Sequence, residues 1–243
     1  MNASTCRLRA AIFLGVLAIA TPVRAGAKDA HEADVVGKNS GNPSAAWTQE
    51  SSTKDLVIQS RPREGSSLRE FRAVGSIAAT PATVFAILDN SEAYPSFMPY
   101  TSECHVLKRE KNSVLAYQRL EIPLVSDRDY TLRSQSAKWL GSDGTIYRIR
   151  WAPANDEGPA VKSGVARVNV CEGGWLLEPD GAGATRATYS IFTDSGGALP
   201  AFLANNGSRI AIRKVFDAIR KRVKDPQFAA AAAKSDPRSD GAN

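Results

Sequence analysis

The stretch PAFLANNGSRIAIRKVFDAIRKRVK, residues 200–224, decides the fold class of this 243-residue chain. Its large apolar side chains recur every three or four residues, and basic residues lie between them and gather toward the C-terminal end. This period is typical of an amphipathic α-helix, and cations near a helix C-terminus interact favourably with the helix dipole. The sequence therefore predicts one long helix with an apolar face close to the end of the chain.

The segments before this helix alternate apolar and polar residues with a period of two, which predicts β-strands. About nine such runs occur, and turn residues such as Asp143-Gly144 and Gly173-Gly174 separate them. One short helix interrupts the strands, because Thr80-Pro81 supplies an N-cap followed by a proline at the first helical position. The predicted fold class is α+β, with a curved antiparallel sheet of about nine strands wrapped around the long C-terminal helix.

The beginning of the chain has the composition of a targeting segment. Two arginines precede an apolar stretch over residues 10–20, and Val23-Arg24-Ala25 matches a small-residue cleavage site. This pattern predicts a signal peptide over residues 1–25, with Gly26 as the first mature residue. A membrane anchor is the alternative, but a helix of 11 residues is shorter than a hydrocarbon core of about 30 Å. The protein is therefore expected to be exported, either periplasmic or secreted.

The remaining boundaries follow from composition. Residues 26–45 and 229–243 hold few large apolar side chains and are predicted to be disordered, which leaves a folded domain over residues 46–228. Without residues 1–25 the chain has 28 Lys and Arg against 25 Asp and Glu, a net charge of +3. That excess is too small to indicate nucleic acid binding.

Patterns for catalysis or metal binding are almost absent. His31 lies in the predicted arm, and the neighbouring Cys104 and His105 would point to opposite faces of a strand, which prevents a nucleophile–base contact. No catalytic residue, metal or other cofactor is therefore predicted. Cys104 and Cys171 remain in the mature chain, and they form either a disulfide or two separate buried thiols.

Six short motifs occur in a fixed order along the middle of the chain. In sequence they are Tyr94-Pro95-Ser96-Phe97-Met98-Pro99, Val125-Ser126-Asp127-Arg128-Asp129-Tyr130, Pro159 through Arg167, Trp175-Leu176-Leu177-Glu178-Pro179, Thr185 to Tyr189, and Asp194 to Pro200. Their order and spacing resemble the START (StAR-related lipid transfer) domain family, within the Bet v 1-like helix-grip superfamily. The resemblance covers nearly the whole folded unit.

The sequence departs from the family pattern in two places. Phe97 stands where the family often has tryptophan, and the acid–arginine pair that some sterol-binding members place in the cavity has no clear counterpart. The nearest equivalent of that pair in this sequence would be Gln118 or Glu121 facing Arg133. The family's strand order implies that Cys104 and Cys171 lie about three strands apart, roughly 14 Å, too far for a disulfide.

The resemblance implies an internal cavity between the sheet and the last helix that holds a hydrophobic ligand. The candidate ligand-binding residues are Phe97, Tyr117, Arg133, Tyr147, Trp151, Tyr189, Leu199, Phe202, Leu203 and Ile210. The alternative for each tyrosine is an ordinary core residue with a satisfied hydroxyl group. Arg128-Asp129 is interpreted either as a ligand-binding or catalytic pair, or as a structural ion pair at the start of a strand.

The C-terminal helix is predicted to act as a gate that hinges at Gly196-Gly197, with the omega loop near 151–161 as the opposite lip. The alternative is that this helix closes the core and never moves. The basic residues on it either form a solvated face or contact an anionic membrane surface transiently.

Three functions follow as hypotheses. The leading one is an exported START-like protein, monomeric and not an enzyme, that binds a lipid or sterol-like molecule for transport or sensing. The second is an enzyme of the same superfamily, such as a polyketide cyclase/aromatase or a hydrolase, and the third is a ligand-free interaction module.

Overall fold

The computed structural model describes residues 45–181, 183–196 and 201–228. The predicted signal peptide, nearly all of the predicted arm, the C-terminal tail, Gly197 and Leu199 lie outside these residues. Among the residues described, no helix is long and apolar enough to cross a membrane.

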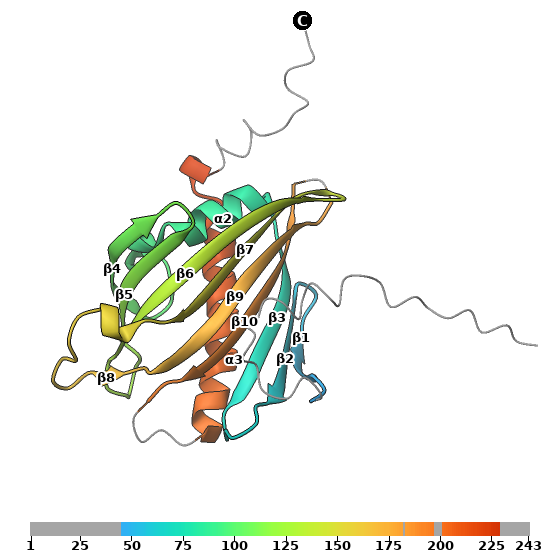
Figure 1. Cartoon of the computed structure of the whole chain (residues 1–243). Helices are drawn as coiled ribbons and strands as arrows, with labels where there is room; N and C mark the ends of the chain where they lie inside the picture. Colours follow the sequence, from blue (N-terminus) through green and yellow to red (C-terminus); the bar gives the residue numbers. More distant parts are fainter. Residues whose placement is uncertain (1–44, 182, 197–200, 229–243) are drawn as a thin grey trace, which may run out of the picture.

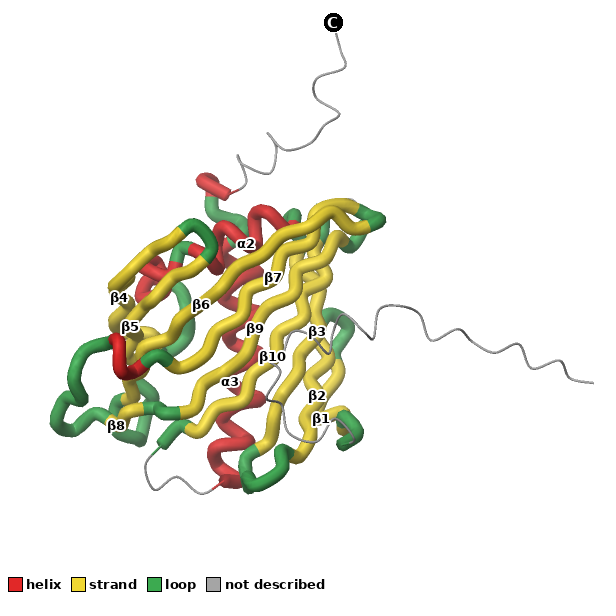
Figure 2. Tube along the Cα trace, viewed as in Figure 1, coloured by secondary structure: helices red, strands yellow, loops and turns green. Residues whose placement is uncertain are grey.

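The described chain forms an α+β fold with one large sheet (Figures 1 and 2). The order along the sheet is β1-β2-β3-β10-β9-β7-β6-β5-β4, with antiparallel neighbours throughout, and β8 pairs in parallel with β6. The strands are β1 (Thr48–Ser52), β2 (Leu56–Pro62), β3 (Arg69–Ile77), β4 (Thr101–Glu110), β5 (Ser113–Leu120), β6 (Arg128–Gly141), β7 (Gly144–Pro153), β8 (Ala166–Arg167), β9 (Val170–Pro179) and β10 (Thr185–Asp194). This arrangement confirms the predicted fold class.

The helices lie on one face of the sheet. The long helix α3 (Ala201–Arg222) runs behind the sheet in Figure 1, and the sheet curves around it. The short helix α2 (Pro81–Asp89) packs against β7 and β9, and it begins as expected, because the Thr80 hydroxyl accepts a hydrogen bond from the backbone N–H of Thr83. Two 3₁₀ helices, η1 (Ser91–Ser96) and η2 (Asn155–Glu157), complete the described elements.

The main core lies between β2, β3, β9, β10, α2 and the C-terminal half of α3. Phe216 and Ile219 of α3 are fully buried there, together with Ile58, Ala73 and Leu177 of the sheet. Each large apolar side chain buried in this way stabilises the fold by about 1.5–3 kcal/mol. This core holds α3 firmly against one half of the sheet.

Cys104 and Cys171 are both free and buried, as predicted. Cys104 lies on β4 and Cys171 on β9, four places apart in the sheet rather than the expected three. Burial raises the pKa of the Cys104 thiol to about 11 and that of the Cys171 thiol to about 12.

Candidate functional site: an internal cavity

The other half of the molecule is hollow. A cavity of about 540 Å³ lies between the N-terminal half of α3 and strands β4 to β7, β9 and β10. Its wall is mostly apolar, and its volume falls within the range of roughly 300–1,000 Å³ typical of small-molecule sites.

The alternation of β5 and β6 decides which side chains reach the cavity. Successive residues of a strand point to opposite faces, so the even-numbered residues of both strands line the hollow and the odd-numbered ones face outward. The lining residues on β5 are Val114, Ala116, Gln118 and Leu120, and those on β6 are Arg128, Tyr130, Leu132 and Ser134.

Small residues on α3 leave the space open. Ala204, Gly207, Ser208 and Ala211 line the cavity at three- and four-residue spacing, so they share one face of the helix. A side chain added at Gly207 would meet nothing within 4 Å of its Cβ. These small residues were not among the predicted ligand-binding residues, although their spacing is visible in the sequence.

The lip opposite α3 is formed by the loop between β5 and β6. Ile122, Pro123 and Val125 line the cavity, and Leu124 between them is fully exposed with a φ of 69°. Tyr100 connects this loop to α3, because its backbone C=O accepts a hydrogen bond from the N–H of Glu121. Its hydroxyl accepts a second hydrogen bond, at 2.8 Å, from the Lys214 ammonium group of α3.

The prediction that residues 151–161 form the lip opposite α3 was wrong for the residues that follow Trp151. Trp151 lines the cavity, but residues 152–161 do not. Ala152 and Pro153 continue β7 beside β6, and Gly158 lies against the outward-facing Thr131 side chain of β6. There the Asn155 side chain accepts a hydrogen bond from the backbone N–H of Thr131, and Glu157 pairs with Arg133.

Three aromatic rings form the floor of the cavity. The ring centroids of Trp175 and Tyr189 are 4.6 Å apart, and those of Trp151 and Tyr189 are 5.8 Å apart. Gly173 lies opposite Trp151 in the sheet, and a Cβ there would come within 2.7 Å of the indole ring. A glycine at this position therefore allows Trp151 to lie across β9. Burial raises the pKa of the Tyr189 hydroxyl far above its ordinary value, so this group is neutral.

Of the ten predicted ligand-binding residues, four line the cavity: Trp151, Tyr189, Leu203 and Ile210. Leu203 and Ile210 are about half exposed, which places them at the rim. Their contact with a ligand stays a prediction.

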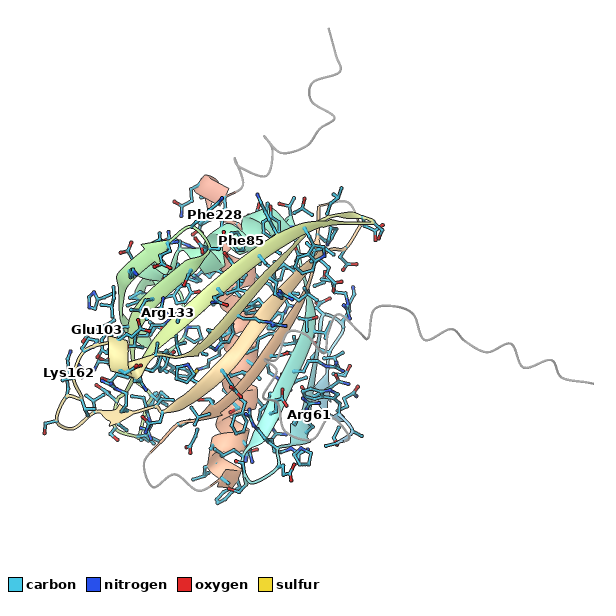
Figure 3. The ribbon with its side chains drawn as sticks, viewed as in Figure 1. Arg61, Phe85, Glu103, Arg133, Lys162 and Phe228 are labelled. Carbon is cyan, nitrogen blue, oxygen red and sulfur yellow. The ribbon has the colours of Figure 1, made fainter. Side chains whose placement is uncertain are left out.

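Five of the other residues do not line the cavity. Tyr147 stacks on Phe85 of α2, with 4.9 Å between the ring centroids, and Phe97 packs beneath the Arg222 guanidinium. Figure 3 labels Phe85 at this end of the molecule. Phe202 is 65% exposed and points away from the hollow. Tyr117 and Arg133 are odd-numbered residues of β5 and β6, so they face outward. Leu199 lies outside the described residues.

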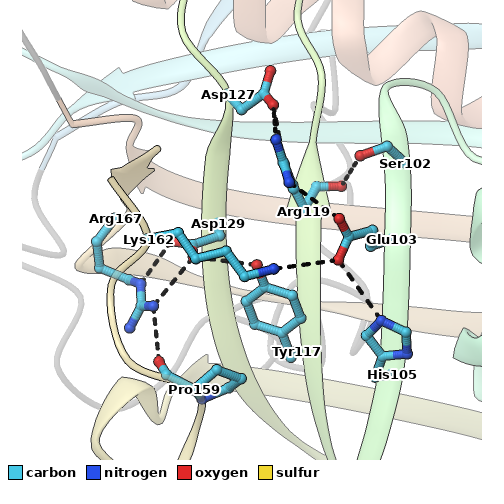
Figure 4. A network of polar contacts seen from close by, with 10 residues as sticks. All are labelled: Ser102, Glu103, His105, Tyr117, Arg119, Asp127, Asp129, Pro159, Lys162 and Arg167. Carbon is cyan, nitrogen blue, oxygen red and sulfur yellow. Dashed lines mark hydrogen bonds and ion pairs between the residues drawn. The ribbon is translucent and has the colours of Figure 1, made fainter. Parts of the chain in front are cut away.

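The outer face of β5 and β6 carries a polar network (Figure 4). The Tyr117 hydroxyl donates to Asp129, and Nε of Arg167 donates to the same carboxylate at 2.7 Å. Burial first, and then the Asp129 charge, raises the pKa of Tyr117 to about 12. Arg119 pairs in the same way with Asp127, with 3.0 Å between Nε and Oδ2.

The interpretation of Arg128-Asp129 as one structural ion pair was wrong. The two side chains point to opposite faces of β6, so Asp129 pairs with Arg167 on the outside while Arg128 lines the cavity. The period of two along β6 was the signal that could have placed Arg128 and Asp129 on opposite faces.

A curved antiparallel sheet that closes on a long C-terminal helix around an apolar cavity defines a domain that binds hydrophobic ligands. The chain belongs to the family described as polyketide cyclase / dehydrase and lipid transport, whose model matches residues 77–220. The START resemblance is confirmed by strong structural matches to StAR-related lipid transfer proteins.

Similar proteins come from bacteria and humans. An uncharacterized protein of Pseudomonas aeruginosa is 31% identical over 144 residues, which are 59% of this chain and 69% of that protein. The crystal structure of a STAR-related lipid transfer protein fragment from Xanthomonas axonopodis is 26% identical, with a TM-score of 0.66 over 74% of this chain and 99% of that one. Human StAR-related lipid transfer protein 5 shares the fold, at 17% identity and a TM-score of 0.65 over 76% of this chain and 89% of that one.

Proposed function

We propose that this protein is exported and binds one lipid or sterol-like molecule in the cavity, which it transports or senses. The observation that carries the proposal is the apolar cavity of about 540 Å³ between α3 and the sheet. Burial of apolar ligand surface there gains roughly 25 cal/mol per Å², so binding needs no covalent chemistry. The similarity to a STAR-related lipid transfer protein supports the same ligand class.

The rim supports ligand entry from one side. Leu203 of α3 and Leu124 of the facing loop are both exposed apolar side chains next to the cavity. The hydrogen bond from Lys214 to Tyr100 joins this edge of α3 to the loop within the described chain, and a lid must open more easily than the core it covers.

Extraction of the purified protein followed by lipid mass spectrometry tests the proposal. We expect about one lipid per chain in the wild type and much less in Ala211→Phe, which places a ring in the cavity. Ala137→Phe, which makes the same substitution at an exposed position of β6 outside the cavity lining, serves as the matched control. Equal recovery from all three proteins would contradict binding in the cavity, and turnover of a polyketide or ester would favour an enzyme instead.

Export is tested separately. N-terminal sequencing of the protein recovered from the cells that express it should begin at Gly26. A mature protein that retains Met1 and remains in the cytoplasm would contradict export without affecting the binding proposal.

A further inference from the structure

The wall of the cavity carries one charge without a protein counter-charge among the described residues. The charged residues that line it are Asp89 and Arg128. Asp89 lies at the rim, where its carboxylate pairs with Arg109 at 2.8 Å. Arg128 is only 4% exposed, and the described chain provides no carboxylate for it.

The acidic neighbours of Arg128 in the sequence are turned away from it. Asp127 and Asp129 point to the outer face of β6, where Arg119 and Arg167 bind them (Figure 4). Each of these carboxylates therefore already has an arginine partner on the other side of the sheet.

The hydrogen bonds of Arg128 are also incomplete. One terminal nitrogen, Nη1, donates to the backbone C=O of Ser126, which fixes the direction of the side chain. Its Nε is buried and has no partner within the described chain. A buried charge without a counter-charge is costly, and so is a buried donor without an acceptor.

Two polar side chains of the cavity wall accompany Arg128. Tyr130 and Gln118 lie next to Arg128 on the same face of the sheet, and the Tyr130 hydroxyl donates to the Gln118 side chain at 3.2 Å. Leu120, the partner of Arg128 on β5, and Leu132 and Trp175 farther along the wall are apolar. The hollow therefore holds one polar cluster with a cation in a mostly apolar wall.

We propose that the ligand is an amphiphile with an acidic head group, a carboxylate or a phosphate, and that Arg128 binds this head group. The Nε edge of a guanidinium matches the two oxygens of either group, and such charge-assisted hydrogen bonds are among the strongest in proteins. The apolar chain of the ligand then extends toward Trp175. This inference rests on the proposed function, since it names the class of molecule that enters the cavity.

The test compares two fluorescent probes that differ only in the charge of the head group: 11-(dansylamino)undecanoic acid and its methyl ester. Dissociation constants are measured by fluorescence titration for the wild type, Arg128→Gln and Arg128→Lys. Arg119→Gln is the matched control, because it removes the same charge from the outer face of the neighbouring strand.

We expect the wild type and Arg119→Gln to bind the acid roughly ten- to hundred-fold more tightly than the ester. Arg128→Gln should lose this preference while its affinity for the ester changes less than about two-fold, and Arg128→Lys should keep part of it. Displacement of the acid probe by hexadecanoate, hexadecyl phosphate and hexadecanol distinguishes the two head groups, and both acids should displace it better than the alcohol.

Equal affinity of the wild type for acid and ester would overturn the inference and leave the proposed function intact. A preference that persists in Arg128→Gln would overturn the role of Arg128. Failure of the wild type to bind either probe, or any of the three competitors, would overturn both proposals.

Discussion

The N-terminal and C-terminal halves of α3 differ in what they pack against. In the C-terminal half, Phe216 and Ile219 are fully buried against the sheet and α2. In the N-terminal half, Phe202, Leu203 and Ile210 are about half exposed or more, and small residues face the cavity. One helix therefore serves as a core element at one end and as a thin wall at the other.

The residues of α3 that stabilise the fold are therefore different from those expected to contact the ligand. Substitutions in the C-terminal half should mainly change the free energy of unfolding, because they disturb close-packed side chains. Substitutions in the N-terminal half should mainly change ligand affinity, because few protein atoms lie opposite them.

The largest effect is expected for Phe216→Ala. The Phe216 ring is fully buried, with its centroid 5.4 Å from that of Trp175, so its loss leaves a cavity in the core. We expect the free energy of unfolding to fall by about 3–5 kcal/mol, measured by denaturant titration. The matched control is Ile210→Ala in the N-terminal half, which lines the cavity and is 54% exposed, and an equal loss in the control would contradict the comparison.

The next effect is expected for Leu203→Asp. Leu203 is 46% exposed at the rim, so water can solvate the new carboxylate and the free energy of unfolding should change by less than about 1 kcal/mol. Uptake of a fluorescent lipid should fall about ten-fold or more, because the apolar contact is lost. Phe202→Asp, on the exposed side of the same turn, should leave uptake nearly unchanged. Global unfolding, or normal uptake by a folded Leu203→Asp protein, would rule out a rim position.

The fold could be predicted from the sequence because its signals are local. The period of residues 200–224 gave α3, and Thr80-Pro81 gave the start of α2. Strand alternation likewise indicates that the even-numbered residues of a strand share a face, whichever face that is.

The inner face of each strand could not be predicted in the same way, because it depends on pairing across the sheet. A shift of one residue exchanges Tyr117 for Gln118 and Arg133 for Leu132 or Ser134, so the choice between them needs the register. The open space beside Gly207 was equally out of reach, since it depends on what the opposite wall leaves unfilled. Sequence reasoning therefore found the cavity but only part of its lining.

A smaller effect, with opposite signs for stability and binding, is expected for Gly207→Leu. Glycine in a helix costs about 1 kcal/mol relative to good helix formers, and the space beside Gly207 is open. The free energy of unfolding should therefore rise by roughly 0.5–1 kcal/mol, while lipid uptake falls several-fold because the side chain occupies the cavity. Gly207→Ala should give most of the stability gain with little loss of uptake. A Leu variant with normal uptake would show that the ligand does not lie against this face of α3.

The smallest effect is expected at the two thiols, which sample the two kinds of environment on the sheet. Burial raises the pKa of Cys104 to about 11 and that of Cys171 to about 12, so little thiolate forms at pH 8 and both react slowly with iodoacetamide. Because the thiolate fraction grows as the pH approaches these values, the alkylation rates should still be rising above pH 9.5. Cys171 lines the cavity, whereas Cys104 does not and packs behind the lining residues Val114 and Ala116. A saturating cavity ligand should therefore slow the alkylation of Cys171 by several-fold and that of Cys104 much less, as measured by peptide mass spectrometry. Equal protection of both thiols would indicate that the ligand tightens the whole sheet rather than filling the space beside β9.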